Sequence, residues 1–423
     1  MPSICFYFQV HQPYRLKNCT YVNKGQVHDY FDEEKNRQIM QKVAAKSYIP
    51  TNKLILKLIR KYAGAFRVAY SITGVAIEQM QRYAPEALDS FRELVDTGCV
   101  ELIGETYYHS LASLYDRDEF KAQVKLHSDL MKQMFGQTPT IFRNTELIYN
   151  DDIGRLAGEM GFKAIIAEGC DDILDWRSPN FVYKVPESDT RLLLKNYSLS
   201  DDIAFRFSNR GWSDFPLTAD KFANWVHRIS GCGETVNLFM DYETFGEHQW
   251  ECTGIFNFLE HMPDAIFNHP HWSFMTPSET IAKYAPVADL PFHRLTSWAD
   301  VGRDITAWRG NRMQHSALEQ AFAIGREMRL SGDTYALDLW RKLLTSDHFY
   351  YMCTKWFADG DVHAYFSPYE SPYDAFINYM NAFGDFRRYY PEKELTKVQT
   401  GAETLLTPPP QLKNPDYRGQ PLQ

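Results

Sequence analysis

Glu146 stands in an apolar run beside other polar residues whose types could do acid–base chemistry. Arg143 and Asn144 precede it within the segment 142–147. The guanidinium of Arg143 would hold the Glu146 carboxyl ionised through its opposite charge, and a carboxylate nucleophile has to be ionised. Taken alone, these residues are explained more simply by a buried structural pair of Arg143 with Glu146.

Asp241 is a second acidic residue at the end of an apolar run. Three hydrophobic residues, 238–240, precede it, and the segment continues to His248. Partial burial and neighbouring negative charge would raise the pKa of Asp241, so that its carboxyl could donate a proton near neutrality. Helix capping is the plainer role for an aspartate in such a place.

Together the two acids have the types that glycoside hydrolysis uses. The reaction needs an ionised carboxylate on one side of the anomeric carbon and a protonated carboxyl on the other, about 5 Å apart where the configuration is retained. The chain contains 54 acidic residues, so many unrelated pairs could be drawn. Glu146 and Asp241 therefore need support from the fold.

Short apolar runs recur along the first two thirds of the chain, as expected for strands buried on both faces. They are separated by helical periodicity, most clearly at residues 52–62, 85–95, 119–135 and 151–160. This alternation predicts an α/β fold built as a barrel of parallel strands. The expected strands begin at Ile4, Phe66, Val100, Ile141, Ala164, Leu192 and Val236, with a weaker eighth at Trp272.

Each expected strand stops at a polar side chain. Taken singly, such a residue is also explained without function, because a strand that reaches the solvent commonly ends at a polar residue. In a parallel barrel, however, the carboxyl ends of all strands converge on one face, and that face carries the chemistry. The side chains expected to meet in one bowl are those of His11, Thr73, Glu105, His109, Glu146, Glu168, Asp201, Asp241 and Thr276.

After about residue 307 the pattern becomes helical, at 313–329, 334–345 and 373–388, with no convincing strand. The last segment contains three consecutive prolines, 408–410, and few apolar residues, as in a loose tail. We therefore predict a barrel over 1–306, a helical C-terminal domain over 307–405 and a tail over 406–423.

The composition narrows the classes of partner. Of the 423 residues, 44% are hydrophobic and 23% charged, which is ordinary for a folded globular protein. A formal charge of -9 makes nucleic acid a poor first guess as partner. Aromatic residues reach 15%, and their flat apolar faces suit sugars as well as large cores.

The same chain gives expectations about its compartment. Its seven cysteines are scattered without a C-x-x-C pair, which favours a reducing environment. The first residues have no basic segment like that of a signal peptide, and no apolar run is long enough for a membrane span. We expect a cytoplasmic protein with no membrane partner, and the oligomeric state stays open.

Five ordered segments of this chain resemble the sequence regions of glycoside hydrolase family 57, and within it the α-amylase group. They run from about residue 5 to residue 311, and the stretches 359–363 and 371–376 are also similar. Five motifs in order are far more specific than any one of them. The segments are HQPYRL at 11–16, GCVELIGETYYHS at 98–110, FRNTELIY at 142–149, FMDYETFGEH at 239–248 and SWADVGRDITAWRGN at 297–311.

The resemblance implies an incomplete (β/α)7 TIM-like barrel followed by a helical domain, acting with retention on α-1,4-glucans such as starch, glycogen or maltooligosaccharides. By position in the motifs, Glu146 would be the nucleophile and Asp241 the general acid/base. No cofactor and no metal ion is implied. The residues expected to bind the α-glucan substrate are His11, Gln12, Glu105, His109, Arg143, His248, Trp298, Asp304 and Trp308.

Several of these assignments have open alternatives. Trp298 and Trp308 would either stack against glucose rings or pack between the barrel and the helical domain. A 4-α-glucanotransferase would use the same two acids but pass the glucosyl group to another sugar. A turn held by aspartate side chains explains the stretch 359–363 more simply than a bound ion.

Two further classes compete with a glycosidase. A metal-dependent carbohydrate deacetylase can share a seven-stranded barrel, and His269 and His271 permit one, yet no H-E-x-x-H motif occurs. A glycan-binding protein without turnover would keep the acids as structural ion pairs. Nucleotide binding and serine hydrolysis have no supporting motif, because G-x-x-x-x-G-K-[ST], G-x-G-x-x-G and G-x-S-x-G are all absent.

Overall fold

A computed structural model describes residues 1–20, 29–355 and 362–390 of the chain. Its centre is a barrel of seven parallel strands in the hydrogen-bonded order β3-β2-β1-β8-β7-β5-β4. This confirms the predicted incomplete (β/α)7 architecture. The strands are β1 (Ser3–Val10), β2 (Val68–Ile72), β3 (Val100–Leu102), β4 (Ile141–Arg143), β5 (Ala164–Glu168), β7 (Arg191–Lys195) and β8 (Thr235–Asp241).

Two pairs of neighbouring strands in the ring are joined by few backbone hydrogen bonds. Between β3 and β4 the only pairing is a parallel bridge from Gly104 to Phe142, supported by Gly104 N–H donating to the Ile141 carbonyl at 2.8 Å. Between β7 and β8 the register contains a single pair, Lys195 with Asn237. By contrast, β1 and β8 pair along almost their whole length. The barrel is therefore incomplete in the sense that β3 pairs with β4, and β7 with β8, through few backbone hydrogen bonds.

The strands form where they do because they are buried on both faces. All eight residues of β1 are buried, and Cys5 and Tyr7 join a cluster inside the barrel with residues of the other strands, such as Phe239. Ile4 and Phe6, which alternate with them, pack outward against the helices. The period of two along a strand thus assigns every second residue to the interior.

Helices cover the outside of the barrel, and their ends follow capping chemistry. The Thr73 side chain accepts from the Ala76 N–H at the start of α3, and Gly136, with φ +72°, ends α6. The barrel-region helices are α1 (Glu33–Val43), α2 (Ile49–Lys61), α3 (Gly74–Tyr83), α4 (Pro85–Asp96), α5 (Ala112–Tyr115), α6 (Arg117–Phe135), α7 (Asp151–Glu159), α8 (Asp171–Leu174), α9 (Tyr197–Ala204), α10 (Ala219–His227), α11 (Ile255–Phe267) and α12 (Pro277–Lys283), with a π-helical turn Ala44–Tyr48.

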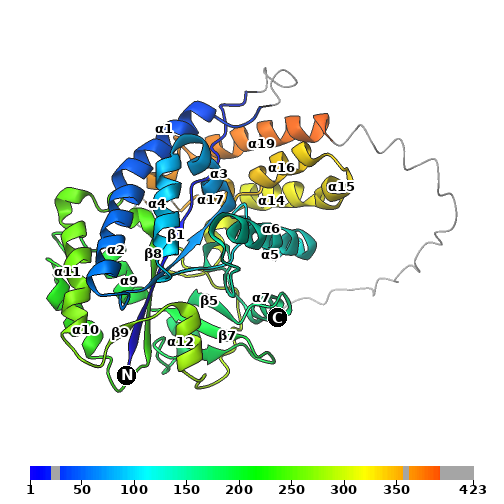
Figure 1. Ribbon diagram of the computed structural model, residues 1–423. Helices are drawn as coiled ribbons and strands as arrows, with labels where there is room; N and C mark the ends of the chain where they lie inside the picture. The colour runs from blue at the N-terminus through cyan, green and yellow to red at the C-terminus, as the bar shows by residue number, and fades with distance from the viewer. Residues whose placement is uncertain (21–28, 356–361, 391–423) are drawn as a thin grey trace, which may run out of the picture.

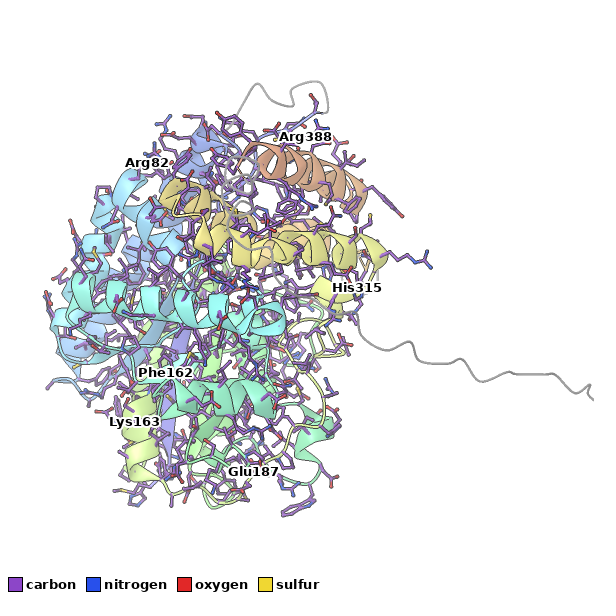
Figure 2. All side chains as sticks on the ribbon, turned by 90° about the vertical axis from the view of Figure 1, so that its right-hand side faces the viewer. Arg82, Phe162, Lys163, Glu187, His315 and Arg388 are labelled. Atoms are coloured by element: carbon purple, nitrogen blue, oxygen red, sulfur yellow. The ribbon has the colours of Figure 1, made fainter. Side chains whose placement is uncertain are left out.

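The C-terminal region is helical, as predicted, and gathers at one end of the barrel (Figure 1). In Figure 2, Arg388 of this region lies at one end of the molecule, and Lys163 and Glu187, which precede β5 and β7, lie toward the other. The helices therefore stand over the carboxyl ends of the strands. They are α13 (Thr306–Arg309), α14 (Arg312–Ala323), α15 (Gly325–Leu330), α16 (Thr334–Leu343), α17 (Ser346–Tyr350), α18 (Val362–Phe366) and α19 (Pro372–Tyr389).

Three expectations about elements need correction. The helix expected over 313–329 is interrupted at Ile324, where α14 ends and α15 begins. The helix expected over 334–345 ends at Leu343, and α17 starts separately at Ser346. The eighth strand, expected at Trp272, is only the two-residue β9 (Ser273–Phe274), which pairs with the start of β1 and takes no place in the ring.

Two of the predicted segments lie wholly or partly outside the described residues. The predicted tail, 406–423, and residues 359–361 of the predicted turn lie outside them. Within them, a two-residue strand β6 (Tyr183–Lys184) pairs antiparallel with β7. No helix among the described residues has the length and apolar character needed to cross a membrane.

Candidate active site

Strand parity places one set of polar side chains at the open end of the barrel. Tyr7 of β1 points inside, and so does Phe239 of β8. Side chains two positions apart on a strand point to the same face, so Gln9 and then His11 follow Tyr7 on the inner face, and Asp241 follows Phe239. Ile141 of β4 leads in the same way to Arg143. The predicted convergence of strand ends follows from this register.

Glu146 lies in a 3-10 turn that follows β4, and its backbone is left-handed with φ +58° and ψ +24°. Its carboxyl receives three hydrogen bonds from distant parts of the chain. His109 Nε2 lies 2.9 Å from Oε1, Ser346 Oγ donates to Oε1 at 3.3 Å, and Trp298 Nε1 donates to Oε2 at 2.6 Å. Both oxygens are thereby held in place.

The charge of Glu146 is set by these neighbours. Burial alone would raise the pKa of its carboxyl, but the His109 hydrogen bond and the charges of His109 and Arg143 bring the pKa below its ordinary value. Glu146 is therefore an ionised carboxylate at neutral pH. Its side chain is 16% exposed, so a ligand in the bowl can reach it.

His109 takes its charge from two carboxylates. Burial would lower the pKa of His109, whereas its hydrogen bonds to Glu105 and Glu146 raise it to about 9. The imidazole is thus a cation near neutrality, with Nδ1 3.3 Å from Glu105 Oε2. Its backbone is also left-handed, with φ +53°.

Arg143 and Glu105 lie behind His109 rather than in the bowl. Arg143 Nη1 donates to Glu105 Oε2 at 3.3 Å, and both side chains are fully buried. Burial would raise the pKa of Glu105, but the His109 hydrogen bond and the Arg143 charge lower it to about 2. Two expectations change: the direct ion pair of Arg143 is with Glu105, not Glu146, and neither Arg143 nor Glu105 is positioned to contact a sugar.

Asp241 ends β8 and is half-buried. Burial raises the pKa of its carboxyl, and the negative charge of Glu146 raises it further. Asp241 lies beside Gln9 in the register of β1 and β8, Gln9 Nε2 lies 3.4 Å from His109 Nδ1, and His109 contacts Glu146, so the two carboxyls belong to one site. The capping alternative finds no support, because the Asp241 side chain makes no capping hydrogen bond to the 3-10 turn Tyr242–Thr244 that follows. The pKa values of the two carboxyls are thus shifted in opposite directions, that of Glu146 downward and that of Asp241 upward.

Glu243 is a third carboxyl at the same place, and sequence reasoning did not single it out. Its Oε1 accepts from Gln12 Nε2 at 3.1 Å and from the Tyr48 hydroxyl. Burial and the charge of Asp241 raise the pKa of Glu243. Gln12 also accepts from Arg15 Nη2 at 3.0 Å. Gln12, expected to bind sugar, therefore has both ends of its amide engaged within the protein.

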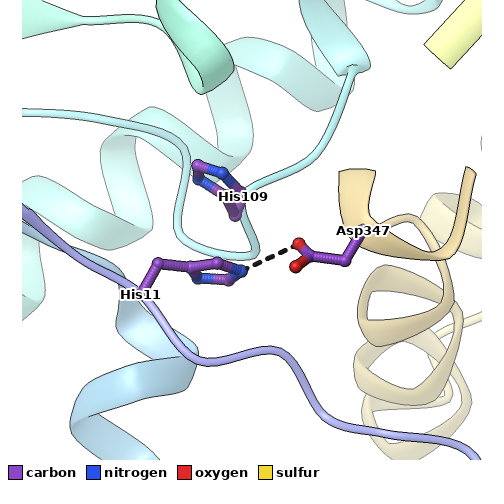
Figure 3. Close-up of side chains that lie close together, drawn as sticks. All are labelled: His11, His109 and Asp347. Atoms are coloured by element: carbon purple, nitrogen blue, oxygen red, sulfur yellow. Dashed lines mark hydrogen bonds and ion pairs between the residues drawn. The ribbon is translucent and has the colours of Figure 1, made fainter. Parts of the chain in front are cut away.

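His11 completes the bowl with a residue from the helical region (Figure 3). Its Nε2 lies 3.0 Å from Asp347 Oδ2, its Nδ1 lies 3.0 Å from Thr73 Oγ1, and its ring stacks on that of His109 with centroids 4.0 Å apart. Asp347 and Ser346, at the start of α17, were not predicted. The only sequence signal for them was an Asp and a Ser between apolar runs.

His11, His109 and Asp347 are also the residues best placed for a metal ion. One ligand atom from each lies within 4.8 Å of the others, and no other such group occurs among the described residues. The contacts argue against an ion here, because His109 Nε2 already contacts Glu146 and His11 Nε2 already contacts Asp347.

The structure also describes the surroundings of three further predicted site residues, Trp298, Trp308 and Asp304. Trp298 donates to Glu146, its ring stacks on Phe239 at 5.1 Å, and it packs against both the cluster inside the barrel and the cluster that extends into the helical region. Trp308 is 1% exposed and packs near Tyr350, so stacking against sugar is ruled out for it in this conformation. Asp304 accepts from the Thr306 N–H at 2.8 Å, beside the start of α13.

Comparison with known proteins agrees with these features. The family model described as glycosyl hydrolase family 57 matches residues 5–291. A protein of Methanocaldococcus jannaschii, named as a candidate alpha-amylase, is 45% identical over 401 residues, which cover 92% of this chain and 85% of that protein.

Solved structures share the fold. A branching enzyme of Thermococcus kodakaraensis superposes with a TM-score of 0.65 at 13% identity, covering 94% of this chain and 93% of that one. An alpha-amylase of Thermotoga maritima gives a TM-score of 0.59 at 12% identity, covering 94% of this chain and 98% of that one. At such identities the likeness concerns the architecture alone.

Proposed function

Because this chain belongs to glycosyl hydrolase family 57, we propose that it cleaves α-1,4-glucosidic bonds in starch, glycogen or maltooligosaccharides with retention of configuration. The similarity in sequence to a protein named as a candidate alpha-amylase supports the substrate class. The bowl at the barrel mouth supports the chemistry, since it holds Glu146 in the same site as Asp241, whose pKa is raised. The single observation that carries the proposal is the set of hydrogen bonds from His109, Trp298 and Ser346 that fixes the Glu146 carboxylate there.

In the first step the glycosidic bond breaks between the two acids. Asp241 gives its proton to the glycosidic oxygen, and Glu146 attacks the anomeric carbon from the opposite face to form a covalent glycosyl-enzyme. The hydrogen bonds from His109 and Trp298 hold the attacking carboxylate in one orientation. They also keep it ionised until the bond to the sugar forms.

In the second step the intermediate is released. Asp241, now ionised, takes a proton from water, and the resulting hydroxide equivalent displaces Glu146 from the anomeric carbon. Two inversions give net retention. The protonated His109 then again faces a negative Glu146, which restores the resting charge arrangement.

The same site can deliver the glycosyl group to a sugar hydroxyl instead of water. Hydrolysis is the primary proposal and 4-α-glucanotransfer the alternative, and product sizes separate them. We keep the barrel over 1–306 and the helical region over 307–405 as proposed domains. We also keep the cytoplasm as the proposed location, because the seven cysteines form no disulfide.

The test is incubation of the purified chain with maltoheptaose, followed by product sizing. Shorter products alone indicate hydrolysis, and longer ones in addition indicate transfer. Glu146→Gln and Asp241→Asn should each lose at least about a thousandfold in rate while staying folded. Glu187→Gln is the control, since Glu187 is 86% exposed. Normal turnover in either active-site variant would refute the assignment.

A further inference from the structure

The segment that follows Asp241 folds back on itself through backbone hydrogen bonds. The N–H of His248 donates to the Glu243 carbonyl at 2.9 Å, and the N–H of Gln249 donates to the Thr244 carbonyl at 3.0 Å. Glu243 is two positions after Asp241 in the chain, so this backbone hydrogen bond brings His248 close to the end of β8. Whatever covers His248 therefore borders the catalytic bowl.

Two rings from the helical region cover His248. The centroid of its ring lies 5.5 Å from that of Phe366 and 6.2 Å from that of Tyr365, both in edge-on arrangements. Tyr365 and Phe366 are themselves 5.0 Å apart. Burial lowers the pKa of His248 to about 4, so the three rings form an uncharged group.

These rings stay open to solvent. Tyr365 is 64% exposed and Phe366 38%. Trp250, two residues after His248, is 61% exposed. We call His248, Trp250, Tyr365 and Phe366 the aromatic strip. Exposed rings gathered in one place are uncommon on soluble proteins and mark surfaces that bind something.

Charged side chains border the aromatic strip. Lys46 Nζ lies 5.8 Å from the centroid of the Trp250 ring. Glu247, which directly precedes His248 in the chain, pairs with Lys42 at 2.5 Å and with Lys46 at 3.7 Å. A surface that offers ring faces beside charged hydrogen-bonding groups matches a sugar, which has an apolar face of C–H groups and a rim of hydroxyls.

We propose that the aromatic strip binds α-glucan residues on the leaving-group side of the cleaved bond. This inference rests on the proposed function and adds a binding surface to it. The side follows from position: Asp241 protonates the departing sugar, and the strip continues from Asp241 through Glu243 and His248, whereas Glu146 is approached from β4. A sugar held there is also the acceptor for transfer, so the strip sets both chain-length preference and the balance of transfer over hydrolysis.

The test uses two strip variants and one matched control. One strip variant carries both Tyr365→Ala and Phe366→Ala, and the other carries Trp250→Ala. Tyr335→Ala is that control, because Tyr335 is 58% exposed and lies on α16, away from His248 in the chain. For maltoheptaose, kcat/KM should fall about tenfold in the strip variants, mainly through KM. For an aryl maltoside, whose leaving group is a single ring, it should change less than about twofold.

A binding measurement separates this proposal from the proposed function. Maltoheptaose is titrated into the Glu146→Gln protein, and then into the same protein that also carries Tyr365→Ala and Phe366→Ala. Calorimetry gives the affinity in each case. About tenfold weaker binding in the strip variants supports the strip even where the wild type fails to hydrolyse glucan. Equal affinity with and without the strip rings, or no binding of maltoheptaose at all, overturns it.

Discussion

His109 and Glu146 are joined by a contact of 2.9 Å between Nε2 and Oε1, and both residues have left-handed backbones, with φ of +53° and +58°. A non-glycine residue in this region costs on the order of 1 kcal/mol, so such residues persist where the surrounding structure enforces them. Here the enforced backbones aim an imidazolium at a carboxylate. The strain therefore coincides with the pair that we propose fixes the nucleophile.

The first prediction concerns this pair. His109→Asn should lower kcat about 100-fold, because the amide cannot reach Glu146 and the nucleophile loses a charged donor. Asparagine tolerates the left-handed backbone, so the fold should stay intact, as circular dichroism would check. The acid limb of the pH profile should move to higher pH as the pKa of Glu146 rises. His261→Asn, at an exposed histidine, should match the wild type.

The second prediction is the shape of the wild-type pH profile. Burial and the charge of Glu146 raise the pKa of Asp241 to about 7. Asp241 therefore holds its proton below that pH, and kcat/KM should fall above about pH 7 as the acid is lost. At low pH activity should fall where Glu146, with its lowered pKa, takes up a proton. Measured kcat/KM across this range would contradict the assignment if the alkaline limb lay in the ordinary carboxyl range.

The third prediction separates the roles of the two acids. With α-maltosyl fluoride as an activated substrate, azide should partly rescue Glu146→Ala and yield a glycosyl azide of inverted configuration, because azide replaces the nucleophile. Azide should also rescue Asp241→Ala, but with retained configuration, because the glycosyl-enzyme still forms. Nuclear magnetic resonance of the anomeric proton reads the outcome. Exchanged configurations would mean exchanged roles.

The fourth prediction concerns the two tryptophans. Trp298→Phe removes the donor to Glu146 Oε2 but keeps a ring on Phe239, so kcat should fall about tenfold with little change in KM. Trp308→Phe is the matched comparison, because Trp308 Nε1 has no hydrogen-bond partner among the described residues. Its activity should stay within about twofold of the wild type. An equal loss in both would show that packing, and not the hydrogen bond, controls the rate.

The fifth prediction concerns metal removal. Because His109 Nε2 contacts Glu146 and His11 Nε2 contacts Asp347, the group of His11, His109 and Asp347 should not need an ion for activity. Dialysis against EDTA should leave kcat unchanged. Loss of activity that added zinc restores would instead support metal-dependent chemistry.

The barrel could be predicted because its signals are local. Runs buried on both faces mark the strands, and β1, β5 and β8 fall where the apolar runs predicted them. The period of two then sends Asp241 into the interior. The breaks at Ile324 and Ser346 could not be read in this way, because helical periodicity continues across them and the packing of neighbouring helices decides where each helix stops.

The sequence by itself determined the residue types and their order along the strands: one acid after β4, another at the end of β8, and a histidine after β1. Only the tertiary structure decided which partners they have. Arg143 pairs with Glu105, Trp298 bonds Glu146, and Ser346 and Asp347 arrive from the helical region. The physical reason is range. Periodicity reports which face of an element is buried, but a pKa depends on charges within a few ångströms, and those come from segments as far as 336 residues away in the chain, as for His11 and Asp347.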